Sequence, residues 1–281
     1  MHGNNMQNMA ELKIILPIAA YSRKPLRKGR RILTMRLNTD GLVIRTRNIG
    51  EADRLITILT RECGVLDAFV RGARRLKGRL ASSTQQFSYA KFILFKSKDA
   101  YVVDEAEPVR LFFEFGNEVE KISLAYYFAE LALVLSPQGD DAEGFLRLML
   151  NTLSFLMDGK REGLLLKSIL ELRLLAMSGY MPNLLGCENC GIFEKDIMYF
   201  NPERACLYCS DCKHQKYGIL AGRGVVSAMR HIVYSEFEKL FQFSVSQESL
   251  KQLSNIAEHY LLTQIQRPFQ TLEFYKSIIE T

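Results

Sequence analysis

The sequence predicts an α+β protein with a small β-barrel followed by a helical domain into which a cysteine-rich module is inserted. Three observations predict this arrangement. Five short β-rich runs fall between residues 37 and 104, helical periodicity takes over after Pro108, and five of the six cysteines lie between positions 187 and 212. A chain of 281 residues with 48% apolar content is large enough to fold in this way.

The first 34 residues are predicted to be a flexible basic extension. They carry seven Lys or Arg side chains against one Glu, and residues 22–31 contain too few apolar side chains to pack. A new composition begins at Met35 and leaves a complete domain downstream of it. Translation starting at Met1 and translation starting at Met35 therefore both stay open.

Residues 35–108 are predicted to form the barrel. Its strands are short apolar runs separated by turn residues, and they cover residues 42–45, 55–59, 65–70, 89–95 and 101–103. Five strands of this length cannot bury both faces of an open sheet, whereas a closed sheet has no unpaired edges. The candidate fold is the five-stranded oligonucleotide-binding (OB) barrel.

Residues 109–281 are predicted to form the helical domain. Apolar residues recur at helical spacing in five segments, namely 118–135, 145–157, 164–177, 225–243 and 250–265. Asp140 with Glu143 is a predicted capping box for the second helix, which Gly159 closes. Because two helices follow the cysteines, we expect the module to be an insertion at about residues 183–217.

The cysteines are spaced as ligands of one metal ion. Cys187 and Cys190 form a Cys-x-x-Cys pair, and a second pair follows about twenty residues later. Two such turns direct four thiolates at one ion, which is typical of a structural zinc site with no position left for water or substrate. We predict one structural zinc ion bound by Cys187, Cys190, Cys209 and Cys212.

Other uses of the cysteines stay open. Cys206 is able to replace Cys209 or Cys212 as a ligand, because its spacing also forms a pair, and His214 is a possible substitute. An odd cluster, with Cys63 far upstream, is not typical of a secreted disulfide framework.

Charge is distributed unevenly along the chain. The net charge of +6 combines +6 for residues 1–34, +7 for residues 35–103 and −7 for the remainder. A basic front indicates a polyanionic partner, since cations that neutralise phosphates release their counterions. The alternative is a solvated basic face without a partner.

Many of the barrel's cations follow the third predicted strand. Residues 71–79 hold five cations and two glycines, and the glycines allow tight turns from which the cations project toward nucleic acid. Two arginines on the first strand extend this face. The predicted DNA-binding residues are Arg45, Arg47, Arg71, Arg74, Arg75, Lys77 and Arg79.

Aromatic residues before and within the fourth predicted strand are candidates for stacking on bases. They are Phe87, Tyr89 and Phe92. Alternation along the strand makes Phe92 equally suited to the core.

Five motifs occur in a recognisable order. They are Thr39-Asp-Gly-Leu-Val-Ile, Gly50-Glu-Ala-Asp-Arg54, Thr60 with Gly64, Arg71-Gly-Ala-Arg-Arg75 and the late paired cysteines. From Met35 to near the C-terminus this order resembles the RecO family of bacterial recombination mediators. Two features depart from the family pattern: the extension before Met35, and Cys206, where a glycine is usual.

The resemblance implies a non-enzymatic protein of DNA repair and homologous recombination, acting in the RecF pathway. Such proteins bind single- and double-stranded DNA, anneal complementary strands and help to load recombinase onto DNA coated with single-stranded-DNA-binding protein (SSB). Their implied partners are RecR and the C-terminal tail of SSB. The helices of residues 118–177 could offer that tail a groove, beside Lys160, Arg161, Lys167 and Arg173, although core residues with ordinary surface cations would give the same pattern.

Common catalytic motifs are absent from the sequence. It has no phosphate-binding loop, dinucleotide-binding motif or nucleophile elbow, and no Lys-x-Asp-Gly of a nucleotide-transfer ligase. Two alternatives to a mediator remain. One is a zinc-ribbon nucleic-acid enzyme with an unrecognised active site, and the other is a protein-interaction scaffold.

Membrane insertion is not expected. No uninterrupted apolar stretch reaches the roughly 18 residues that a membrane span requires. We expect a cytoplasmic protein associated with the nucleoid.

Overall fold

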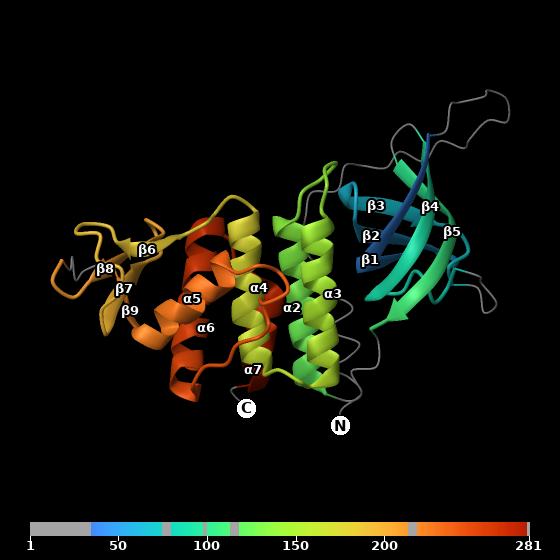
Figure 1. Cartoon of the computed structure of the whole chain (residues 1–281). Coiled ribbons are helices and arrows are strands. Elements are labelled where there is room, and N and C mark those ends of the chain that lie inside the picture. Colours follow the sequence, from blue (N-terminus) through green and yellow to red (C-terminus); the bar gives the residue numbers. More distant parts are fainter. Residues whose placement is uncertain (1–34, 75–79, 98–99, 113–117, 213–217, 280–281) are drawn as a thin grey trace. The chain divides into compact units, whose positions relative to one another are not determined.

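The computed structural model describes residues 35–74, 80–97, 100–112, 118–212 and 218–279 (Figure 1). The chain divides into two compact units. The first comprises Met1–Tyr127, Gln138–Asp141 and Phe269–Thr281, and the second comprises Phe128–Pro137 and Ala142–Pro268. The basic extension predicted for residues 1–34 lies outside the described residues.

Five strands in the first unit close into a barrel, and each corresponds to a predicted run (Figure 1). They are β1 (Met35–Ile49), β2 (Asp53–Thr60), β3 (Gly64–Val70), β4 (Ser88–Ser97) and β5 (Ala100–Leu111). Their order around the barrel is β1-β2-β3-β5-β4, with β3 and β5 parallel. The strands are longer than the predicted runs, because backbone pairing continues through polar residues that a hydrophobic pattern does not include.

Strand β1 pairs with both β2 and β4, and Gly41 makes this possible. Gly41 pairs with Thr60 of β2 and with Ala90 of β4. A Cβ atom on Gly41 would lie 2.5 Å from Ile58 Cγ2 and 2.9 Å from the backbone oxygen of Leu59. A side chain here would force the strands apart, so a residue without Cβ is required.

Alternate residues of the strands point inward and form an apolar core. Its fully buried members include Val43, Ile56, Ile58, Ala68, Val70, Phe92 and Leu94. Phe92 is only 1% exposed. The prediction that Phe92 stacks on bases is therefore wrong, and the alternative of a core position is confirmed.

Most of the remaining described chain is helical, as predicted. The helices are α2 (Val119–Leu135), α3 (Glu143–Asp158), α4 (Gly163–Met177), α5 (Arg223–Tyr234), α6 (Gln247–Ile265) and α7 (Gln270–Ile279). Helix α7 was not predicted, because its apolar pattern is short. Among the described residues, no helix combines the length and apolarity needed to cross a membrane.

Two predicted helix features are wrong. Helix α5 ends at Tyr234, well before residue 243, because Ser235 adopts an extended conformation. The capping box does not form: α3 is capped at Ala142 without a side-chain hydrogen bond, and Asp140 Oδ1 instead accepts from the amide of Asp141 at 2.8 Å. The predicted end of α3 is confirmed, since Gly159 has φ +62°.

Helix α4 contacts α3, α5 and α6 in the second unit and carries a buried charge network. Lys167 Nζ lies 2.9 Å from Glu171 Oε1 on the same helix and 2.9 Å from Glu258 Oε2 on α6. It also lies 3.4 Å from Ser254 Oγ on α6. Because Lys167 is 1% exposed, it joins two helices inside the core, and the prediction that it borders a partner groove is wrong.

Arg173 on α4 also contacts a neighbouring helix, in this case through backbone oxygens. Its Nη1 donates hydrogen bonds to the backbone oxygens of Ile232 and Val233, at 3.1 and 2.7 Å. These carbonyls lie in the last turn of α5, where a cation is favourable. Arg173 therefore fastens α5 to α4.

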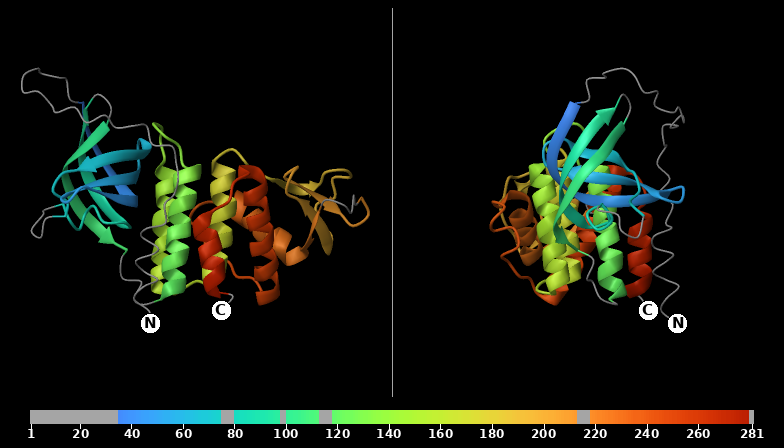
Figure 2. Two further views of the ribbon diagram at one scale, coloured as in Figure 1. Left: turned by 180° about the vertical axis from the view of Figure 1, so that it is seen from behind. Right: turned by 90° about the vertical axis from the view of Figure 1, so that its right-hand side faces the viewer.

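The cysteine-rich segment folds as a second sheet between α4 and α5 in sequence (Figure 1). Its strands are β6 (Asn183–Cys187), β7 (Ile197–Asn201), β8 (Cys206–Cys209) and β9 (Ile219–Gly222), in the order β6-β8-β7-β9. The sheet packs against α5 and α6 (Figure 2). Two of the predicted metal ligands lie at strand ends of this sheet: Cys187 ends β6 and Cys209 ends β8.

Candidate metal centre and nucleic-acid surface

Four cysteines converge at the ends of β6 and β8. The sulfur atoms of Cys187, Cys190, Cys209 and Cys212 all lie within 4.8 Å of one another. Those of Cys190 and Cys209 are 3.7 Å apart. Four sulfurs placed tetrahedrally at about 2.3 Å from one ion would be separated by about 3.8 Å. The four thiols therefore have the arrangement needed to hold a metal ion.

Backbone hydrogen bonds shape the two turns that carry these thiols. The amide of Gly191 donates to the oxygen of Cys187 at 2.8 Å, and the amide of Cys212 donates to the oxygen of Cys209 at 3.2 Å. Gly191 has φ +71°, which favours glycine. Asn189 Nδ2 donates to the oxygen of Cys212 at 3.3 Å and links the two turns.

The surroundings of the cluster shift the pKa values of Cys187 and Cys212 in opposite directions. Burial raises the pKa of Cys187, but backbone amides of Cys190, Cys209 and Asn189 outweigh burial and bring the pKa down to about 6. Hydrogen bonds with the Cys190 and Cys209 side chains, together with burial, raise the pKa of Cys212 to about 12. Thiolates this close repel one another, so a cation between them is what allows all four to ionise.

Cys206 does not belong to this cluster. It precedes Cys209 by three residues in β8, and residues an odd number apart in a strand point to opposite faces. Burial raises the pKa of Cys206, which is 4% exposed. The favoured set of four cysteines is thus the one that the fold brings together, while His214 lies outside the described residues.

At one end of the barrel, hydrogen bonds connect the turn between β1 and β2 with the segment that follows β3. The amide of Arg74 donates to the oxygen of Ala52 at 3.0 Å. Arg74 Nη1 donates to the oxygen of Gly50 at 3.2 Å, and the amide of Gly72 donates to Asp53 Oδ1 at 2.8 Å. These contacts hold together the two sequence segments in which DNA-binding arginines are predicted. We call this junction the basic end of the barrel.

Exposed arginines surround the basic end. Arg47, Arg71 and Arg74 are all exposed. Arg54, which was not among the predicted residues, lies near Arg74 but is half-buried, and its Nη1 donates to the backbone oxygen of Thr84 at 2.9 Å. Burial lowers the pKa of Arg54, and so does the nearby charge of Arg74. The sequence feature that could have identified Arg54 is its position in β2 directly after the turn that contains Gly50. Arg75, Lys77 and Arg79, which are also predicted to bind DNA, lie outside the described residues.

Arg45 is engaged by the barrel itself. Its Nε donates to Thr57 Oγ1 at 3.2 Å, and its Nη2 lies 3.8 Å from Asp67 Oδ1. Thr57 Oγ1 in turn donates to Asp67 Oδ1 at 2.6 Å. The three side chains link β1, β2 and β3, and burial lowers the pKa of Arg45. Arg47 is therefore the more accessible of the two predicted cations on β1.

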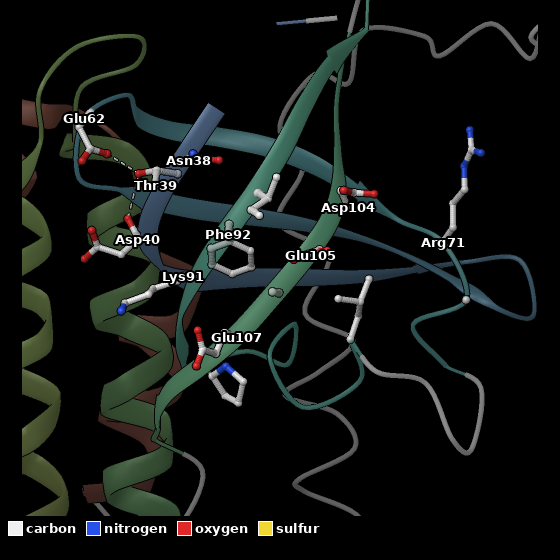
Figure 3. Close-up of a pocket in the computed structure, with 15 residues that line it drawn as sticks. Asn38, Thr39, Asp40, Glu62, Arg71, Lys91, Phe92, Asp104, Glu105 and Glu107 are labelled. Atoms are coloured by element: carbon white, nitrogen blue, oxygen red, sulfur yellow. Dashed lines mark hydrogen bonds between the residues drawn. The ribbon is translucent and has the colours of Figure 1, made fainter. Parts of the chain in front are cut away.

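A cavity of about 1110 Å³ opens on the barrel beside the basic end, since Arg71 and Gly72 are among its lining residues (Figure 3). Its lining has more carboxylates than cations; the charged residues are Asp40, Glu62, Arg71, Lys91, Asp104, Glu105 and Glu107. Thr39 donates a hydrogen bond to Glu62, and Arg71 stands apart from the labelled carboxylates (Figure 3). The carboxylates of this lining disfavour phosphates, so we expect nucleic acid to meet Arg71 from the basic end rather than inside the cavity.

The remaining predicted stacking residues are buried or are engaged by other side chains. Phe87 is 4% exposed, and its ring packs edge-on against Tyr126 with centroids 5.3 Å apart. The prediction that Phe87 stacks on bases is therefore wrong. Tyr89 is half-buried and donates its hydroxyl to Asp40, whose carboxylate also accepts two hydrogen bonds of 2.8 Å from Arg61.

Comparisons with known proteins cover both units. The family model "Recombination protein O N terminal" matches residues 35–112, and "Recombination protein O C terminal" matches residues 116–273. A DNA repair protein RecO from Acetivibrio thermocellus is 33% identical over 243 residues, which is 86% of this chain and 97% of that protein. Proteins with the same name from Alkaliphilus metalliredigens and Symbiobacterium thermophilum are each 29% identical. They align over 87% and 86% of this chain, and over 100% and 97% of their own length.

Proposed function

The chain belongs to the recombination protein O family of DNA repair proteins, and from this premise we propose that it is a non-enzymatic mediator of homologous recombination. In this proposal it binds single- and double-stranded DNA, anneals complementary strands and helps to load recombinase onto SSB-coated DNA in the RecF pathway. Its proposed partners besides DNA are RecR and the C-terminal tail of SSB.

We propose that the barrel is an OB fold and is the DNA-binding domain. The closed strand order supports this assignment, because the OB fold is a five-stranded Greek-key barrel that binds oligonucleotides. The proposed domains are residues 35–108 for the barrel and 109–281 for the helical domain, with the metal module inserted at about 183–217.

The basic end of the barrel is the observation that carries the proposed function. Arg47 on β1 is distant in sequence from Arg71 and Arg74, and hydrogen bonds join the turn after β1 to the segment that carries the other two arginines. Exposed cations grouped in this way bind phosphates without reading sequence. The site therefore suits a protein that acts on any DNA strand.

Removal of these charges tests the proposal. Replacing Arg47, Arg71 and Arg74 with alanine is expected to weaken binding to single-stranded DNA by roughly tenfold or more at low salt. If each arginine contacts one phosphate, the slope of log affinity against log salt falls by about 2. Fluorescence anisotropy at several salt concentrations measures both quantities.

A matched control separates local charge from net charge. Replacing the exposed residues Arg147, Lys239 and Lys251 removes the same charge from the second unit. The salt dependence of this control is expected to stay close to that of the unchanged protein. Equal losses in the two variants would refute a DNA site at the basic end, and no loss in either would favour a protein-interaction scaffold.

Annealing is expected to need no nucleotide. A protein that holds two phosphate backbones side by side reduces their repulsion, so base pairing begins without hydrolysis. Complementary oligonucleotides should therefore anneal at the same rate with and without ATP in magnesium-free buffer, as followed by energy transfer between end labels. A strict requirement for ATP would instead support the zinc-ribbon enzyme.

We propose zinc as the metal of the four-cysteine site. Four thiolates are typical ligands of structural zinc, and the sulfur separations fit a tetrahedral ion. Cys187, Cys190, Cys209 and Cys212 would hold it. With all four positions filled by protein, the ion would stabilise the module and would leave no site for substrate.

The site for the SSB tail is proposed only in part. Lys167 and Arg173 are engaged within the second unit and are not available to a partner. Lys160 has a side chain that is 68% exposed, and Arg161 is half-buried with its Nη1 on the backbone oxygen of Phe243. Lys160 is thus the most accessible of the four cations that the sequence offered for an acidic tail.

A further inference from the structure

A row of side chains crosses the outside of the barrel from one part of β1 to another. Each residue of the row is paired, in the strand register, with the next residue on the neighbouring strand. In order, the row is Arg47, Leu55, Phe69, Val102, Phe95 and Arg36. We call these six residues the outer row.

The apolar members of the outer row point away from the core. Ala68 and Val70 flank Phe69 in β3, and both are fully buried inside the barrel. Alternation along the strand then places Phe69 outside. Phe95 follows the fully buried Leu94 in β4 and is placed outside for the same reason. Both phenylalanines are half-buried, so part of each side chain meets solvent.

The two ends of the outer row are cationic. Arg36 and Arg47 are exposed, and Arg47 also belongs to the basic end of the barrel. A strip with aromatic residues in its middle and arginines at its ends matches a single strand of nucleic acid, which has apolar base faces and charged phosphates. Because all six residues lie on the described strands, the fold itself aligns the strip.

We propose that the outer row is the floor on which unpaired bases of a DNA strand lie. Phe69 and Phe95 contact the faces of bases, and Arg36 and Arg47 contact the backbone on either side. The two phenylalanines lie on strands separated only by β5, about 10 Å apart along the sheet, so each meets a different base. This inference rests on the proposed DNA-binding function and adds how the barrel distinguishes single strands.

The distinction follows from which surfaces each form of DNA exposes. A duplex hides the faces of its bases in the stack, whereas an unpaired strand presents them. The basic end binds both forms through phosphates. The outer row adds affinity only for a strand with exposed bases, so it favours single strands over duplex.

Leucine variants test the stacking directly. Phe69→Leu and Phe95→Leu keep an apolar side chain and remove the ring. We expect each to weaken binding to a thymidine oligonucleotide of roughly 16 nucleotides by about tenfold. Binding to an abasic oligonucleotide of the same length, measured by the same anisotropy assay, should change by less than about twofold, since it offers phosphates without bases.

Two further variants control this experiment. Phe69→Tyr keeps the ring and should bind the thymidine oligonucleotide within about twofold of the unchanged protein. Val109→Ala removes an apolar side chain that is 51% exposed on β5 but lies outside the outer row. It should leave the affinity for both oligonucleotides unchanged.

A crosslinking measurement keeps the test valid if a leucine variant fails to fold. The unchanged protein is irradiated with an oligonucleotide that contains 5-iododeoxyuridine, and the crosslinked peptides are identified by mass spectrometry. We expect crosslinks at Phe69 or Phe95. Crosslinks confined to other residues would overturn the inference.

The outcomes separate this inference from the proposed function. If the leucine variants bind both oligonucleotides like the unchanged protein while the Arg47, Arg71 and Arg74 variant loses affinity, the outer row is not a base-binding floor and the proposed function stands. Equal loss on thymidine and abasic oligonucleotides would also contradict stacking. If an acidic peptide with an aromatic end loses binding in the leucine variants while DNA does not, the row is a protein site. If no variant affects DNA binding, both proposals fail.

Discussion

Replacement of Cys187 and Cys190 by serine is expected to abolish metal binding and to unfold the cysteine module. The two residues supply half of the proposed ligand set, and serine hydroxyls do not replace thiolates on zinc. In the proposed zinc site the ion supplies much of the stability of the small sheet β6–β9, so we expect its loss to cost more than about 4 kcal/mol locally. Metal analysis and limited proteolysis within residues 183–222 measure the two effects.

The matched control is Cys206→Ala. Cys206 is buried in the same sheet but is absent from the four-cysteine cluster. This variant should keep one zinc per chain and resist protease like the unchanged protein. If the unchanged protein, purified without chelator, contains no zinc and has an intact module, the cysteines are not a zinc site. If Cys206→Ala loses the metal, the ligand set is different from the one proposed.

Replacement of Lys167 by alanine is expected to be the most damaging single change in the core of the second unit. It removes the cation that lies 2.9 Å from both Glu171 and Glu258. Glu171 has a side chain with 0% exposure, so its charge would remain buried without this cation. Breaking such a pair costs about 3–5 kcal/mol, which should appear as a lower midpoint in urea unfolding.

Two further variants give that result its meaning. Lys160→Ala removes a lysine that is 68% exposed and should change stability by no more than about 0.5 kcal/mol. Lys167→Met combined with Glu171→Leu removes the cation and the more deeply buried carboxylate together and should recover most of the lost stability. If Lys167→Ala unfolds at the same urea concentration as the unchanged protein, the network does not hold α4 to α6.

Features that depend on neighbouring residues could be predicted from the sequence. The five strands of the barrel were found because short β-rich runs between turns mark strands, and α2, α3, α4 and α6 were found because of their helical periodicity. The four-cysteine cluster was predicted from spacing, since a Cys-x-x-Cys turn fixes where its two sulfurs point. The basic end was predicted in part, because Arg71 and Arg74 belong to a nine-residue segment that is rich in cations.

Features that depend on the tertiary packing of helices and strands could not be predicted from local sequence patterns. Lys167 looked like a surface cation because a sequence does not show that α4 is surrounded by other helices. Phe87 and Phe92 looked like stacking residues, but the structure buries Phe92 in the barrel core and Phe87 against Tyr126, while Phe69 and Phe95 were not predicted to bind bases. Local alternation gives the two faces of a strand, but it does not say which face the closed barrel turns outward.

The sequence by itself therefore determined the five strands of the barrel, the helices α2, α3, α4 and α6, the four candidate metal ligands and the basic character of the front of the chain. Only the tertiary structure decided the partners of these parts: the register that aligns Arg36, Phe95, Phe69 and Arg47 across the barrel, and the burial of Lys167 between two carboxylates. The physical reason is the range of the interactions. Turn geometry and periodicity act over a few residues, whereas strand register and burial are set by the packing of residues that are far apart in the chain.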